Sequence, residues 1–192
     1  MGEPIQLLLE RFAMLTTDST YFRTDSCQTA DMHVNSIASG TLALALVLGA
    51  IGQVSAKPNF TGEWKMNPDK SNFAPLPAPD KLVRRINHSG SRLKITTTQA
   101  GQQREIVTDL AYTTDGAECK NAIRGEEFSG TARWDGDTLV IESKREVQGM
   151  EIVQKERWAL AGDGQTLTIV NHVHTPQGGF DITIVLEKQA AR

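Results

Sequence analysis

Alternating apolar and polar side chains, interrupted by short turns, run through residues 58 to 188 and constrain the fold more than any other feature. In the last such segment, Phe180, Ile182 and Ile184 alternate with Asp181 and Thr183. A period of two places one kind of side chain on each face of an extended strand, whereas a helix requires a period near 3.6. No segment after residue 57 that is longer than a turn has helical periodicity. The pattern predicts an all-β protein of half-buried strands.

Hairpin turns separate the expected strands. The dipeptides Asp115-Gly116, Asp135-Gly136 and Asp163-Gly164 provide the residues that adopt positive φ in tight turns. Such short connections favour antiparallel pairing between strands that are neighbours in the sequence. The expected strands span residues 60–66, 82–88, 92–98, 104–113, 118–124, 127–134, 138–147, 150–160, 166–174 and 179–188.

A sequential meander of about eight to ten strands would leave two unpaired edges unless the sheet closed on itself. An antiparallel up-and-down β-barrel is therefore the expected architecture. A two-sheet sandwich is the alternative, but its Greek-key crossings require longer links than this chain has. The longest link, 67–80, contains four prolines and is expected to be a stiff loop, because proline has no backbone N–H to donate.

The segment 32–56 has the layout of a secretory signal peptide. An apolar run, 37–51, precedes Val54 and Ala56, and these small residues suit a small-x-small cleavage site. We therefore expect residues 1–31 to be a mis-annotated or disordered extension, 32–56 to be the signal peptide, and 57–192 to be a secreted or periplasmic domain.

A membrane anchor is the alternative interpretation of the same apolar run. Fifteen residues would form about 22 Å of helix, which is short of a hydrocarbon core of roughly 30 Å. Cleavage therefore explains the segment better than anchoring, although no lysine or arginine precedes the run after Met32.

The charge balance of residues 57–192 excludes some classes of partner. The first 56 residues hold two arginines and five acidic residues, which leaves 18 basic and 18 acidic residues in the rest of the chain. A surface of balanced charge is unlike that of nucleic-acid-binding or membrane-surface proteins, which carry clustered basic residues. Cys27 would leave with the prefix, so Cys119 is expected to be a lone, buried thiol.

Continuing the alternation along each strand places a few polar residues on the apolar face. Ile141 is followed on its face by Ser143 and Arg145, and the same reasoning turns Arg84 and Glu156 inward. Unpaired buried charges cost several kcal/mol each. These residues therefore indicate either an internal ion-pair network or a wet cavity, unless the strand ends lie at the barrel mouth or a bulge changes the register.

Short motifs match a known superfamily. They are Gly62-x-Trp64 in the first strand, Lys188 at the end of the last inward stripe, and the segments 94–98 and 135–146. With these motifs the chain resembles the calycins, the lipocalin and fatty-acid-binding-protein type of barrel, and in particular small secreted bacterial lipocalin-like proteins of unassigned function. The resemblance implies that Gly62 and Trp64 open the barrel and that Lys188 packs across the indole at its closed end. A cation over an indole contributes about 0.5–2 kcal/mol.

The chain departs from the superfamily pattern in three ways. The usual lipocalin disulfide is absent. About ten expected strands fit the fatty-acid-binding proteins better than the eight-stranded lipocalins. The Pro-rich loop 67–80 takes the place of the helical lid of the fatty-acid-binding proteins. These departures leave the subfamily and the ligand open.

No catalytic motif or cofactor signature is present, so we expect neither enzymatic activity nor a cofactor. His172 and His174 share one face of a strand and, with His88, offer ligands for zinc or haem. However, Leu167 and Val173 occupy the inward face of that strand, so both histidines are expected on the surface and no metal site is predicted.

The preferred functional hypothesis is a binding module for a small, mostly apolar or amphipathic molecule, with neither nucleic acid nor membrane as partner and with the oligomeric state left open. Apolar walls with a few convergent polar groups are typical of such sites. The alternative is a solid barrel that acts through its surface as an inhibitor or envelope interaction protein. The expected ligand-binding residues are Arg84, Trp134, Ile141, Arg145, Ile152, Gln154, Glu156 and Trp158.

Overall fold

Ten antiparallel strands make up the protein in a computed structural model that describes residues 56–101, 104–147 and 149–190. All ten expected strands are confirmed, each within three residues of its expected start and end. They are β1 (Gly62–Met66), β2 (Lys81–Ser89), β3 (Arg92–Gly101), β4 (Arg104–Thr113), β5 (Asp115–Ile123), β6 (Glu126–Asp135), β7 (Thr138–Val147), β8 (Met150–Leu160), β9 (Thr166–Thr175) and β10 (Gly178–Lys188).

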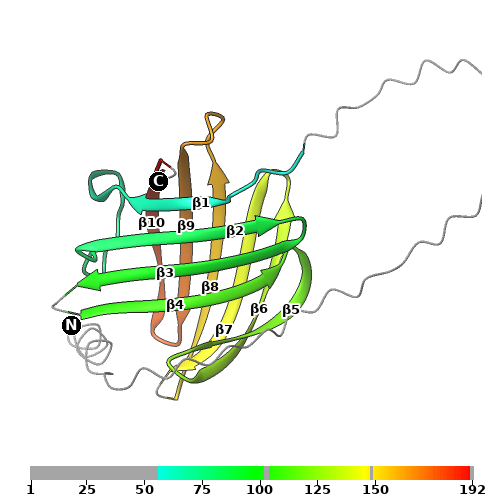
Figure 1. Cartoon of the computed structure of the whole chain (residues 1–192). Helices are drawn as coiled ribbons and strands as arrows, with labels where there is room; N and C mark the ends of the chain where they lie inside the picture. The colour runs from blue at the N-terminus through cyan, green and yellow to red at the C-terminus, as the bar shows by residue number, and fades with distance from the viewer. Residues whose placement is uncertain (1–55, 102–103, 148, 191–192) are drawn as a thin grey trace, which may run out of the picture.

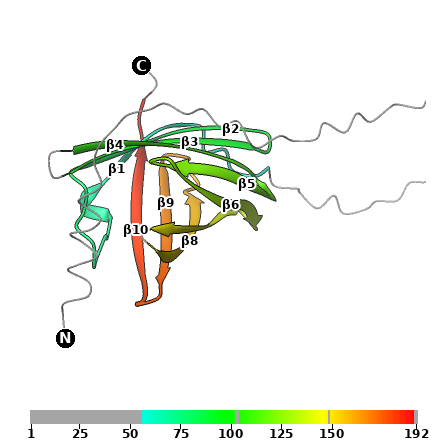
Figure 2. The same cartoon turned by 90° about the horizontal axis from the view of Figure 1, so that it is seen from below.

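The strands form one up-and-down sheet that curls into a nearly closed barrel. Their order is β4-β3-β2-β1-β10-β9-β8-β7-β6-β5, so the pairing of β1 with β10 joins the two ends of the meander. Strands β1 to β4 form one layer that crosses over β7 to β10 (Figures 1 and 2). The inward faces of the two layers enclose the interior, which confirms the expected architecture.

The boundary between β4 and β5, which we call the seam, has no backbone ladder among the described residues. Along the chain, the single residue Thr114 connects the end of β4 to the start of β5. The buried side chain of Asn121 spans the seam instead: its Oδ1 accepts from the Ala111 N–H at 2.8 Å, and its Nδ2 donates to the Ala111 carbonyl at 3.0 Å. A side-chain amide thus replaces a missing pair of ladder bonds, which satisfies backbone groups that would otherwise be unpaired.

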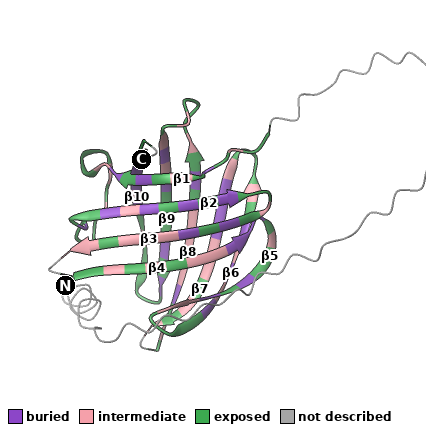
Figure 3. Cartoon of the chain, viewed as in Figure 1, coloured by how far each residue is buried: buried purple, intermediate pink, exposed green. Residues whose placement is uncertain are grey.

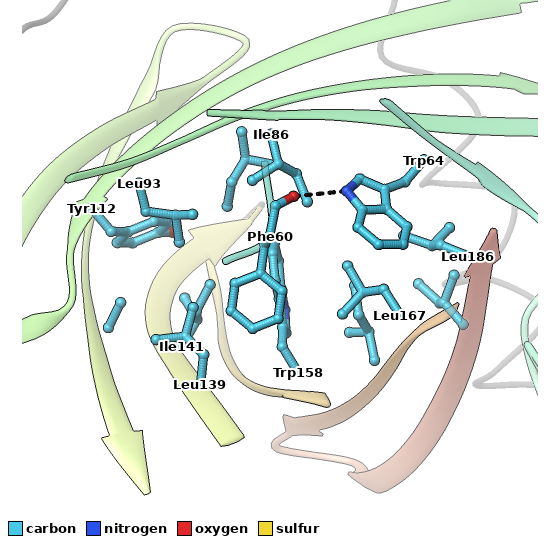
Figure 4. Close-up of a cluster of buried hydrophobic side chains, with 14 of the residues drawn as sticks. Phe60, Trp64, Ile86, Leu93, Tyr112, Leu139, Ile141, Trp158, Leu167 and Leu186 are labelled. Atoms are coloured by element: carbon cyan, nitrogen blue, oxygen red, sulfur yellow. Dashed lines mark hydrogen bonds between the residues drawn. The ribbon is translucent and has the colours of Figure 1, made fainter. Parts of the chain in front are cut away.

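The core follows the inward faces predicted from alternation. Buried positions occur along the strands of both layers (Figure 3). Their side chains point toward one another across the interior (Figure 4). Phe60, Trp64 and Trp158 are its largest fully buried residues. The indole Nε1 of Trp64 donates to the Phe60 carbonyl at 2.8 Å, so the polar atom of this buried ring is satisfied (Figure 4).

The start of β1 is fitted closely to the end of β10. The ammonium of Lys188 lies 5.3 Å from the centre of the Trp64 ring. Gly62 has φ +148°, and a Cβ at this position would lie 2.8 Å from Cε of Lys188. Only glycine therefore leaves room for the lysine to reach the indole, which gives the Gly-x-Trp motif a physical reason.

The Pro-rich segment 67–80 is a loop, as expected, apart from one 3-10 turn over Pro68–Lys70. The Asn67 side chain caps this turn by accepting from two backbone N–H groups. A bridge between Asn72 and Thr183 then holds the loop against β10. Phe73 and Leu76 pack on the core, so the loop is part of the folded structure.

The expected extension 1–31 and nearly all of the expected signal segment 32–56 lie outside the described residues. Within the described part, no helix combines the length and apolarity needed to cross a membrane. Cys119 on β5 is fully buried, as expected. Its sulfur is disulfide-bonded, so the expectation of a lone thiol is wrong.

Candidate binding site in the barrel

A cavity of about 60 Å³ with both polar and apolar walls lies inside the barrel. One water needs roughly 10–15 Å³ of such volume, so the cavity has room for a few waters. It is smaller than the roughly 300–1,000 Å³ of typical small-molecule pockets. Its walls are Arg84, Ile95, Thr97, Leu110, Tyr112, Ile123, Phe128, Ile141, Ser143, Arg145, Gln154 and Glu156.

Arg84 and Glu156 form a two-pronged ion pair across the interior. Nη1 of Arg84 donates to Oε2 of Glu156 at 3.1 Å, and Nη2 donates to Oε1 at 3.3 Å. Trp158 adds a third bond, from its Nε1 to Oε2 at 2.7 Å, and the guanidinium lies 5.3 Å from the centre of that indole. Burial favours the neutral carboxyl, but the arginine and the indole outweigh it and hold the pKa of Glu156 below its ordinary value.

Arg145 is the second interior cation and has no salt-bridge partner among the described residues. Its buried Nε makes no hydrogen bond there. Burial lowers the pKa of this guanidinium, and the negative charge of Glu126 partly offsets the effect. Arginine nonetheless keeps its charge in proteins. In the part of the chain that the structure describes, the cavity is therefore lined by one arginine in an ion pair, Arg84, and one without an ion pair, Arg145.

Tyr112 on β4 brings a neutral hydroxyl to the same wall. Burial raises the pKa of its phenol, the charge of Glu156 raises it further, and the two interior arginines oppose the shift. A Cβ on Gly130 would lie 3.0 Å from the Tyr112 ring and 2.9 Å from the Glu142 carbonyl oxygen. Glycine at position 130 thus makes room for the tyrosine beside the β6–β7 ladder.

Five of the eight expected ligand-binding residues line this cavity: Arg84, Ile141, Arg145, Gln154 and Glu156. The other three do not. Ile152 and Trp158 are buried in the core, and Trp134 stacks on Phe60 and lines a different hollow. The sequence reasoning assigned no face to β3, β4 and β5, and so missed Tyr112, although its alternation with Leu110 carried the signal.

The exposed positions of His172 and His174 on β9 confirm the surface assignment of both residues. The ring of His172 pairs with Asp181 on β10, its direct cross-strand neighbour. Among the described residues, no group of three or more metal-ligating side chains comes together. His88 lies on β2 and is buried, whereas His172 and His174 are exposed on β9.

Comparison with known proteins supports the fold. The sequence matches no protein-family model and no curated protein. Its structure is similar to that of a secretory abundant heat soluble (SAHS) protein from Ramazzottius varieornatus, with 16% identity, a TM-score of 0.50, and coverage of 67% of this chain and 94% of that one. The chain thus has a calycin-like barrel fold.

Two further solved structures resemble it at lower scores. One is the zebrafish ileal bile acid-binding protein complexed with cholic acid, with 19% identity, a TM-score of 0.48, and coverage of 68% and 98% of the two chains. The other is a fatty acid-binding protein from the brain of Drosophila melanogaster, with 12% identity, a TM-score of 0.47, and coverage of 67% and 99%.

Proposed function

We propose that the protein is an extracytoplasmic binding protein that holds a small amphipathic molecule inside the barrel, with an anionic head group against Arg145. The observation that carries this proposal is the buried Nε of Arg145, which has no hydrogen-bond partner among the described residues. A buried guanidinium nitrogen without an acceptor is costly, and a bound anion would supply both the missing acceptor and a counter-charge.

The apolar part of the ligand would lie against Leu110, Ile123, Phe128 and Ile141, which line the same cavity. The space of about 60 Å³ must enlarge to admit it. Leu110 and Ile123 lie on opposite sides of the seam, so movement of β4 away from β5 would widen the cavity. Because the seam has no backbone ladder among the described residues, this movement breaks fewer bonds than separation at any laddered pair.

Titration with decanoate and with the uncharged decanol tests the proposal. Decanoate should bind saturably, and Arg145→Gln should weaken it by about tenfold while leaving decanol nearly unchanged, because only the acid uses the charge. Arg145→Lys, which keeps the charge, should bind decanoate better than Arg145→Gln does. Saturable binding of neither compound to a folded protein would refute the proposal.

Export rests on the layout of residues 32–56 rather than on the barrel. Cleavage after Ala56 would give a mature chain that begins at Lys57. Mass spectrometry of the protein secreted from its full coding sequence would reveal that terminus, and any passenger molecule that remains bound. A chain that retains residues 1–56 would contradict the export proposal without affecting the binding proposal.

A solid barrel that acts through its surface is the second candidate. The Arg84–Glu156 pair and the small cavity favour it, because they show much of the interior already filled. Gln154→Trp separates the two functions, because the larger side chain would fill the cavity. It should abolish decanoate binding if the ligand enters the cavity, and it should leave an activity of the barrel surface unchanged.

A further inference from the structure

A second hollow, of about 270 Å³, lies where the chain enters the barrel before β1. It shares no lining residue with the interior cavity. We call it the entry hollow, and it brings together the segment before β1, the β2–β3 turn and the end of β6. Its walls are Lys57, Pro58, Asn59, His88, Gly90 and Trp134.

Two flat rings, those of His88 and Trp134, line the entry hollow, and the buried ring of Phe60 packs behind them. Phe60 stacks on Trp134, with ring centres 5.8 Å apart and planes 13° apart. Phe60 also stacks on His88 at 5.7 Å and 20°. Trp134 is only half-buried, so part of its ring remains open to a ligand. Such a wall favours a planar aromatic partner, because offset stacking adds to the gain from burial.

Positive charge lies at the rim of the entry hollow. The ammonium of Lys57 is 5.7 Å from the centre of the Trp134 ring. It donates to the Gly136 carbonyl at 2.7 Å and lies 3.9 Å from the Asp137 carboxylate. Lys57 is half exposed, and an ammonium has three protons to donate, so it can also bind an anion.

His88 supplies an unused polar group inside the entry hollow. The residue is 7% exposed, and neither ring nitrogen has a hydrogen bond of good geometry among the described residues. Its backbone is fixed by Thr61, whose Oγ1 donates to the His88 carbonyl and accepts from its N–H, both at 3.0 Å. A neutral imidazole offers one donor and one acceptor. Buried polar atoms without partners are rare in proteins, and a ligand oxygen would satisfy one here.

We propose that the entry hollow binds a small planar aromatic carboxylate. The ring would stack on the open part of Trp134, and the carboxylate would accept from Lys57 and from the ring N–H of His88. A ligand cation would be repelled by Lys57, and an aliphatic chain would leave the flat face of Trp134 poorly filled. This site is independent of the interior cavity, so neither proposal requires the other.

Benzoate and its uncharged analogue benzamide are the probes. The full chain is titrated with each, and the indole N–H of Trp134 is followed by NMR. Benzoate should shift that signal saturably, and benzamide should bind at least about tenfold more weakly, because it lacks the charge. Lys57→Gln should weaken benzoate by about tenfold, whereas Lys57→Arg should stay within about threefold of the unmodified protein.

Two controls make the outcome decisive. Lys120→Gln removes a lysine from β5 outside the entry hollow and should leave benzoate binding unchanged. Arg145→Gln should also leave it unchanged. Loss of benzoate binding in Arg145→Gln but not in Lys57→Gln would place the acid in the interior cavity, which would overturn this proposal and support the binding function proposed for the barrel. The absence of any saturable shift would overturn it as well.

Discussion

The side chain of Asn121 bonds both backbone groups of Ala111 across the seam, at 2.8 Å and 3.0 Å. Every other pair of sequential strands is joined by a ladder. One buried side chain therefore does at the seam what rows of backbone bonds do elsewhere. This makes the β4–β5 boundary both the weakest line of the barrel and the one most easily altered by a single substitution.

Asn121→Leu should lower the free energy of unfolding by about 1–3 kcal/mol, because it leaves the N–H and carbonyl of Ala111 without partners. Urea denaturation measures the loss, and amide hydrogen exchange should show faster opening at Ala111. Asn171→Leu is the matched control. Asn171 is equally buried, but its Oδ1 has no partner among the described residues, so its replacement should cost little. Equal losses in the two variants would contradict a special role for Asn121.

The interior ion pair predicts strong coupling between two substitutions. Glu156→Gln leaves Arg84 buried without its counter-charge and should destabilise the fold by about 3–5 kcal/mol. The double variant Arg84→Met with Glu156→Leu should recover most of that loss, since paired buried charges contribute little net stability relative to apolar residues. Urea denaturation of both variants checks this. A double variant no more stable than Glu156→Gln would show that the pair contributes more than charge compensation.

His88 predicts a pH dependence of stability. Burial lowers the pKa of its imidazole from 6.5, and the backbone of Gly90 opposes the shift only in part. Between pH 6.5 and the lower pKa of His88 in the folded state, the unfolded chain therefore binds a proton at this residue that the folded chain does not bind. The free energy of unfolding should fall as pH decreases through that window.

Replacing His88 by Phe should flatten this slope, since a phenylalanine can keep the stack on Phe60 without titrating. The same change at an exposed histidine, His174→Phe, is the control and should keep the slope. Urea midpoints measured at several pH values between 5 and 8 give the comparison. A slope that survives in His88→Phe would assign the proton to another group.

The strands could be predicted because their information is local. Alternation and Asp-Gly turns are read within a few residues, and all ten strands follow from them. The inward direction of Arg84 and Glu156 followed from the same alternation. Their pairing did not, since the two residues are 72 positions apart and meet only through the curvature of the whole barrel.

No short stretch of the sequence predicts where the seam lies or how large the cavity is. Asn121 fits the alternation of β5 like any other inward residue, and its function depends on the backbone of the strand beside it. Cavity volume depends on how side chains from opposite layers fit together, so the same inward faces are compatible with a filled or an open interior. Trp134 was expected at the interior site for this reason and instead lines the entry hollow.

Gly62→Ala should destabilise the barrel by more than its backbone conformation alone explains. The new Cβ would lie 2.8 Å from Cε of Lys188, so the lysine must leave the Trp64 ring or β1 must shift from β10. We expect a loss of about 1–3 kcal/mol for the strained backbone, and about 0.5–2 kcal/mol for the lost cation–indole contact.

Gly90→Ala provides the matched control for that substitution. Gly90 has φ +59°, but a Cβ there meets no atom within 4 Å, so this variant reports backbone strain without a clash. Urea denaturation should show the larger loss for Gly62→Ala. In a Lys188→Ala background, which removes the clashing atom, the cost of Gly62→Ala should fall toward that of Gly90→Ala. An unchanged cost in that background would mean that the strained backbone, rather than the lysine, requires glycine at position 62.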